Sequence, residues 1–534
     1  MLPRTKYIAL SHCWGSYEIL KTTKGNLGSL MRRIEWTALS KTFQDVIELC
    51  RKLGVRYVWI DSLCIVQDDD RDWEREALNM AQIYEHAFVV VSAAAARDGS
   101  VGLFGPRKPV QILASNDTET TMTVRTTGSQ YRYIVRPSPE ESDQEIKYVV
   151  RDMARHAQWD PRENMALISG DFNPLNSRAW AFQERLLATR IVHFADHEMI
   201  WECHEGQRCE CTQLDGHDSR PYLERDTLEV KQRFSEITRT SDTHASPFFT
   251  WANVIELYNQ RALTFEKDRL PALVGAAAKM QNTKTGTYVA GLFLGEFPRC
   301  LLWKVPGPGV RQDDYYAPTW SWASVIMPSG NPNRATYPWT YYTPYTPTTR
   351  GYKYAVVESF VSLLGLRYVD EPERGPKVAA LHVRGRLMRV SFSFKLSDKP
   401  AMTTEVMADA IYFNEPLRTF RYFVSRDNKK AYFESDLILH EGRHQLEENS
   451  DLFLLAVGRS AISRHPDLFI VLKRLEKPND FEIFASIHSA DANLVDTAFA
   501  RIGSFLLKAP DEEEVDPDCL DWLEEAEEQE LTLF

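Results

Sequence analysis

The stretch YVWIDSLCIVQDDDRDWEREALNMAQIYEHAFVVVS, residues 57–92, decides the fold because two apolar runs flank one helical pattern. The first run, Tyr57–Ile60, is β-branched and aromatic, as expected of a fully buried strand. The second run, residues 87–91, is too short for a helix and is typical of another strand. The helix between them has one apolar face, formed by Ala77, Met80, Ala81 and Tyr84. Two strands joined by a crossover helix form a right-handed βαβ unit, which predicts a parallel sheet.

The chain before residue 57 adds a strand and a helix. Residues 7–10 (YIAL) form a short apolar run that ends in the polar segment Ser11–Gly15. After a long loop, Thr42 and Asp45 resemble a capping box, and Gly54 is placed to end the helix. The predicted buried stripe of this helix consists of Phe43, Val46, Ile47, Cys50 and Leu53. The order β-loop-α-β-α-β predicts a doubly wound α/β sheet.

Sheets of this type bind ligands beyond the carboxyl ends of their strands. Here those ends carry Ser11–Gly15, Asp61–Ser62 and Ser92–Ala93. Because parallel strands end at the same edge of a sheet, we expect these side chains to gather at one site.

A second core segment follows the third predicted strand after a gap. Residues 177–187 (SRAWAFQERLL) form a predicted helix that Asn176 or Ser177 caps. Trp180, Gln183, Glu184 and Leu187 share one face of it. Residues 190–194 and 199–203 form a predicted hairpin. An acid and an amide on the same face as a buried Trp are unusual and mark Glu184 as a candidate functional residue.

Composition indicates a globular intracellular protein. A chain of 534 residues with 43% apolar and 26% charged residues is ordinary for a multidomain soluble protein. The sequence has no run of eighteen apolar residues, so no membrane span is predicted. The N-terminus lacks a secretory apolar segment. Eight cysteines in so long a chain fit a reducing compartment. We therefore expect a cytoplasmic location.

The net charge of −12 is concentrated in one segment. Residues 511–530 hold twelve Asp or Glu and no Lys or Arg, so the rest of the chain is near neutral. A neutral body gives no electrostatic reason to bind nucleic acid or an anionic membrane. We predict that residues 511–534 form a solvated acidic tail.

Three motifs carry a family resemblance. The sequences YIALSHCWG (7–15), the block from residue 57 to 94, and SRAWAFQERLLATRIVHF…IWEC (177–203) resemble the heterokaryon-incompatibility (HET) domain of fungi. The segments 251–277 and 317–324 resemble blocks that often follow that domain. The resemblance implies a role in fungal non-self recognition, in which fused cells of unlike genotype undergo programmed cell death. The resemblance then implies that the chain binds an incompatibility partner protein or forms a homo-oligomer.

The HET domain is in turn similar to the TIR domain, although the long insertion here departs from the compact TIR pattern. Residues 177–187 resemble the TIR segment in which a Trp precedes a Glu that is catalytic in NAD-cleaving members. The resemblance therefore implies Glu184 as the catalytic residue of a NAD glycohydrolase, with NAD as substrate and no certain cofactor. Its expected binding residues are Ser11, Trp14, Gly15, Asp61, Ser92 and Trp180.

The chemistry of that reading is coherent. Cleavage of the nicotinamide–ribose bond passes through an oxocarbenium-like state that a carboxylate stabilises. A structural alternative stands beside it, in which Glu184 forms an ion pair with Arg178, with Arg185 or with an Arg of a neighbouring strand. Two other functions stay open for the chain: a non-catalytic self-associating signalling module, or a biosynthetic or hydrolytic enzyme that reuses the fold.

Other groups of reactive or charged residues give weaker evidence of a functional site. His12 and Cys13 are adjacent on an extended segment and point to opposite faces, so they do not form a catalytic dyad together. The cysteines and histidine of residues 203–211 lack the spacing of a zinc site, and no metal site is predicted. The acids at 68–70 fit the start of a helix. No glycine-rich phosphate loop is present.

The predicted organisation has four parts. A HET domain spans residues 1–205, with an insertion at about 103–176 that contains a strand pair near 122–124 and 133–135. A helical and loop-rich region follows at 206–350. A β-rich domain at 351–510 precedes the acidic tail, and its role is open.

Overall fold

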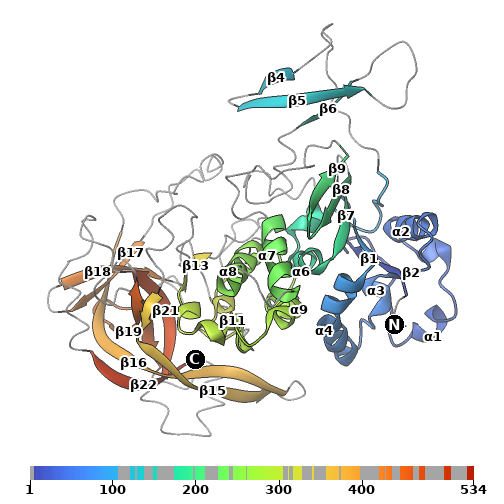
Figure 1. The fold of residues 1–534 in the computed structure, drawn as a ribbon. Coiled ribbons are helices and arrows are strands. Elements are labelled where there is room, and N and C mark those ends of the chain that lie inside the picture. The colour runs from blue at the N-terminus through green and yellow to red at the C-terminus, as the bar shows by residue number, and fades with distance from the viewer. Residues whose placement is uncertain are drawn as a thin grey trace.

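A computed structural model describes much of the chain (Figure 1). The described residues are 5–105, 121–126, 129–137, 148–152, 173–195, 199–210, 227–239, 245–259, 261–304, 311, 317–326, 340–341, 356–371, 375–396, 420–426, 429–435, 446–460, 468–475, 498–506 and 526–534.

The N-terminal part is built on one sheet with the strand order β2-β1-β3-β7-β8-β9. Its strands are β1 (Tyr7–Ser11), β2 (Tyr57–Trp59), β3 (Val89–Ser92), β7 (Arg190–Phe194), β8 (Met199–Cys203) and β9 (Gly206–Cys209). The first four are parallel, and β7-β8-β9 is antiparallel. The predicted α/β fold with a parallel sheet is confirmed, although the sheet as a whole is mixed. The predicted hairpin at 190–203 is also confirmed.

Helices cover both faces of this sheet because successive side chains of β1 point to opposite sides. Ile8 and Leu10 pack with α2 (Lys41–Lys52). Tyr7 and Ala9 pack with two other helices, α4 (Asp70–His86) and α6 (Ala179–Leu187). The short helices α1 (Leu27–Leu30) and α3 (Asp61–Cys64) lie in the connections.

Four local predictions were wrong. Tyr57 is 49% exposed because β2 is an edge strand, not a fully buried one. Ser40 caps α2, since its hydroxyl accepts from the Phe43 amide, whereas Asp45 accepts from Leu103. Leu53 is half exposed at the end of α2. Helix α6 begins at Ala179 after a 3₁₀ turn over 174–177, so neither Asn176 nor Ser177 is its cap.

The insertion contains β4 (Thr121–Thr126), β5 (Ser129–Pro137) and β6 (Tyr148–Asp152). Strands β4 and β5 pair antiparallel, which confirms the predicted strand pair. The other insertion residues between 106 and 172 lie outside the described residues.

A helical layer follows the first sheet (Figure 1). It consists of α7 (Thr227–Arg239), α8 (Pro247–Asn259) and α9 (Pro271–Met280). Short strands β10 (Tyr288–Val289), β11 (Leu292–Phe293), β12 (Trp303–Lys304) and β13 (Thr340–Tyr341) accompany it. One apolar core continues from β1 through these helices into the C-terminal sheet. The boundaries at residues 205, 350 and 510 remain predictions.

The predicted β-rich region forms a nine-stranded sheet. Its strands are β14 (Val356–Ser359), β15 (Val361–Glu371), β16 (Gly375–Leu396), β17 (Phe420–Arg426), β18 (Lys429–Ser435), β19 (Asp451–Ser460), β20 (Leu468–Arg474), β21 (Ala498–Leu506) and β22 (Glu527–Leu533). Because β16 pairs with both β17 and β19, the path β16-β17-β18-β21-β20-β19 closes on itself. The result is a closed ring of antiparallel strands.

Strand β22 corrects the prediction of a solvated tail. It pairs with β16 along seven residues and buries Leu531 and Leu533, while residues 527–530 stay exposed. The last residues, Leu531, Thr532, Leu533 and Phe534, are all buried, and they supply the contact with the core that the acidic composition concealed. Residues 511–525 lie outside the described residues. Within the part that the structure describes, no helix has the length and apolar character needed to cross a bilayer.

Candidate active site

Ser11, Asp61 and Ser92 meet at one edge of the first sheet. Ser11 and Ser92 end β1 and β3 and are paired in register, and Asp61 opens α3 just beyond β2. Both serines are buried. Helix α6 packs against the same sheet and brings Glu184 to this edge, where its carboxyl interacts with Ser11 and Asp61.

Asp61 forms the outer part of the cluster. Its carboxylate accepts hydrogen bonds from the indole Nε1 of Trp14 (2.9 Å) and from the Ser62 amide (2.7 Å). The Nδ1 atom of His12 lies 3.7 Å from Oδ1, the carboxylate oxygen that accepts from the Ser62 amide. A quarter of the Asp61 side chain is exposed, so the cluster reaches solvent here.

Glu184 forms the inner part. Its side chain is buried, and burial raises the pKa of Glu184 to about 7, against an ordinary value of 4.5. The neighbouring hydroxyls of Ser11 and Tyr84 and the charge of Arg178 lower the pKa, whereas the charge of Asp61 raises it. Among the residues that the structure describes, its Oε2 atom has no hydrogen-bond partner. Buried polar atoms without a partner are rare in folded proteins, so this oxygen marks Glu184 as a candidate functional group.

Arg178 supplies the positive charge of the site. Its Nη1 donates to the His12 carbonyl at 3.0 Å, and its guanidinium also interacts with Cys13 and Glu184. Burial raises the pKa of the Cys13 thiol and lowers the pKa of the His12 imidazole. A thiol kept protonated is a poor nucleophile, which agrees with the sequence argument against a dyad of these two residues.

Comparison with known proteins adds one finding. Residues 7–184, from the start of β1 to Glu184 itself, match the family model described as Heterokaryon incompatibility protein (HET). Residues 7–184 are a HET domain. The match links the chain to heterokaryon incompatibility and confirms the resemblance drawn from the three motifs. Neither the curated proteins nor the solved structures gave a match.

The remaining predicted site residues of the HET domain have structural partners. Gly15 has a positive φ of 62°, and a Cβ there would lie 2.4 Å from Asp98, so only glycine fits. Ser92 is enclosed between β1 and β7. Trp180 donates to Asp268 (3.3 Å) and packs edge-on against Trp73.

The structural alternative for Glu184 is not what the described residues show. Arg185 instead forms a buried ion pair with Glu202 (2.6 Å), and no ion pair within 4.0 Å joins Glu184 to Arg178 among the described side chains. Tyr84 and Arg178 were missed as site residues. Tyr84 had a signal, because it was the one hydroxyl in an otherwise apolar helix face.

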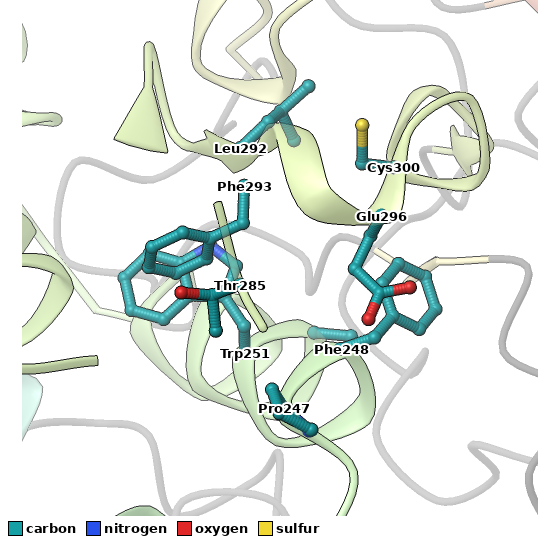
Figure 2. Close-up of a pocket in the computed structure, with 9 residues that line it drawn as sticks. Pro247, Phe248, Trp251, Thr285, Leu292, Phe293, Glu296 and Cys300 are labelled. Atoms are coloured by element: carbon teal, nitrogen blue, oxygen red, sulfur yellow. The ribbon is translucent and has the colours of Figure 1, made fainter. Parts of the chain in front are cut away.

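Two other places are less suited to chemistry than the HET-domain cluster. Within the described residues, no group of three His, Cys, Asp or Glu side chains could hold a metal ion, and Cys211 lies outside them. Figure 2 shows a hollow lined mainly by Phe248, Trp251 and Phe293. Its Glu296 pairs with Arg299, and burial raises the pKa of its Cys300 to about 12. The mainly apolar lining of this hollow is typical of a packing defect in the core and not of a catalytic site.

We expect Glu184→Gln to change how the stability of the HET domain depends on pH. Because the folded-state pKa is about 7, the folded protein binds more protons than the unfolded chain between pH 4.5 and 7. The wild type therefore loses stability as pH rises through this window, and the Gln variant lacks that loss. The variant should gain up to about 3 kcal/mol relative to wild type between pH 4.5 and 8. Urea unfolding at both pH values measures this, and a pH-independent difference would contradict it.

Proposed function

We propose that the HET domain cleaves the nicotinamide–ribose bond of NAD, as an effector of fungal non-self recognition and programmed cell death. The observation that carries the proposal is the buried carboxyl of Glu184, whose Oε2 has no partner among the described residues, beside the partly exposed Asp61. The parallel strand order 2-1-3, continued by β7, agrees with a flavodoxin-like sheet, whose ligands lie at the strand ends.

The raised pKa of Glu184 fits this substrate. The nicotinamide ring of NAD is cationic, and a cation beside a carboxyl group favours its ionised form. The bond from ribose C1′ to the ring nitrogen breaks with both electrons going to nitrogen, so neutral nicotinamide leaves. The ionised Glu184 stabilises the oxocarbenium ion and then takes the proton of the attacking water.

The rim residues have roles in this proposal. Asp61, fixed by Trp14, lies where ribose hydroxyls would approach, and Arg178 would face a phosphate. Lys21 lies over the Trp14 ring, 4.8 Å from its centroid, which holds the indole in place.

The test is nicotinamide release from NAD by the purified full chain, with Glu184→Gln measured in parallel. Release by the wild type that the variant lacks is the expected result. No release by the wild type, or equal release by both, overturns the proposal.

A second candidate, a self-associating module without catalysis, is favoured by one surface. Met31 is 80% exposed, and Leu27, Ile34 and Trp36 are each 37–38% exposed within ten residues of it. Clustered exposed apolar side chains mark contact surfaces. On this reading, Met31→Glu should shift sedimentation of the full chain towards monomer, and cell killing should survive Glu184→Gln. A monomeric wild type, or killing that needs Glu184, removes this candidate.

A further inference from the structure

Three consecutive residues of α6 are attached to three different elements. Successive side chains on a helix are about 100° apart, so Gln183, Glu184 and Arg185 point in three directions. The Oε1 atom of Gln183 accepts from the Ala276 amide of α9 at 3.0 Å. Glu184 faces the strand ends and Tyr84 of α4. Arg185 faces β8.

The contact to α9 is close. A Cβ on Gly275 would lie 2.9 Å from Gln183 Oε1 and 2.9 Å from the Ala81 Cβ of α4. Glycine therefore lets α9 approach both α4 and α6, and Gln183 reaches the backbone of α9 at the Ala276 amide. Gln183 is itself 1% exposed.

The contact to β8 is a buried ionic cluster. Glu202 accepts from Arg185 Nε (2.9 Å) and Nη2 (2.6 Å), from Lys231 Nζ of α7 (2.9 Å) and from Gln207 Nε2 of β9 (2.9 Å). Glu202 and Lys231 are fully buried. Burial alone would raise the pKa of Glu202, but the charges of Arg185 and Lys231 hold it well below its usual range.

We propose that Gln183, Arg185 and Glu202 are positioning residues that fix the rotation of α6 and so hold the Glu184 carboxyl at the strand ends. Rotating α6 about its axis would move both side chains away from their partners, because the same helical turn carries them on either side of Glu184. The reacting carboxyl of the proposed function depends on this placement, and a displacement of about 1 Å can cost about 100-fold in rate. Glu202 and Lys231 lie beyond the matched residues 7–184, so the site needs more of the chain.

The test measures how the environment of the Glu184 carboxyl changes, and it does not depend on enzymatic activity. The apparent pKa of Glu184 is measured from the pH dependence of stability, by comparing the full chain with and without Glu184→Gln. The same pair is then measured in a Gln183→Met background and in a Leu186→Ala background. Leu186 is also buried on α6 but makes neither attachment, so it is the matched control.

We expect Gln183→Met to lower the apparent pKa of Glu184 by one or more, a tenfold change in proton affinity, because a released α6 lets water reach the carboxyl. Leu186→Ala should leave the pKa unchanged. An unchanged pKa with Gln183→Met, or an equal fall with Leu186→Ala, overturns the proposal. If Gln183→Met does not fold, Arg185→Lys gives the same comparison, since lysine cannot reproduce the bidentate contact. A wild type without NAD cleavage would refute the proposed function and not this placement.

Discussion

Glu184→Gln should slow nicotinamide release from NAD at least about 100-fold, while at pH 8 the variant unfolds no more easily than the wild type. Glutamine has nearly the same shape and leaves in place the hydrogen bond from the Ala276 amide to Gln183 and the ion pair of Arg185. It cannot carry the negative charge that opposes the oxocarbenium ion. The loss should therefore appear in kcat more than in KM.

Asp45→Asn is the matched control for this result. Asp45 is also a buried carboxylate of the HET domain, but it packs on the α2 face of the sheet, away from the Glu184 cluster. Its replacement should keep the rate within about twofold of wild type. An equal loss of rate in both variants would mean that the activity follows stability and not the Glu184 charge.

Glu202→Gln should destabilise the full chain by about 3–5 kcal/mol, the largest effect expected of any single substitution considered. The change leaves the buried charges of Arg185 and Lys231 without their shared carboxylate. Taking a charge out of water is costly unless an opposite charge compensates it. Urea unfolding at pH 7 measures the difference.

The double variant Glu202→Gln with Lys231→Met should recover part of that loss, because it removes one of the two uncompensated charges. A triple variant with apolar residues at positions 185, 202 and 231 should recover more. If Glu202→Gln costs less than about 1 kcal/mol, the cluster is not the buried ionic centre described above.

The parts of the fold set by local pattern were predictable. The continuous apolar run from Tyr7 to Leu10 predicted a buried strand, and the helical spacing of Ala77 to Tyr84 predicted a buried helix face. Strand-end reasoning then grouped Ser11 with Asp61. These inferences succeed because each depends on residues close together in the chain or on a general rule of parallel sheets.

The parts that depend on long-range partners were not predictable in this way. Asp45 looked like a cap residue but bonds to Leu103, and Lys231 gave no sign that it would be buried against Glu202. Charged residues are rarely fully buried, so pattern alone places them at the surface. The acidic composition near residue 530 likewise led to the prediction of a solvated tail, although Leu531 and Leu533 anchor β22 in the core.

Strand β22 has a consequence for the order in which the nine-stranded sheet is completed during translation. It pairs with β16 and β21, yet the ribosome makes it after the other eight strands of this sheet. Until it emerges, the backbone groups of β16 that it covers at residues 381–387 remain an open edge. A nascent chain stalled before residue 527 would therefore expose an unpaired, aggregation-prone strand edge that a chaperone would have to shield.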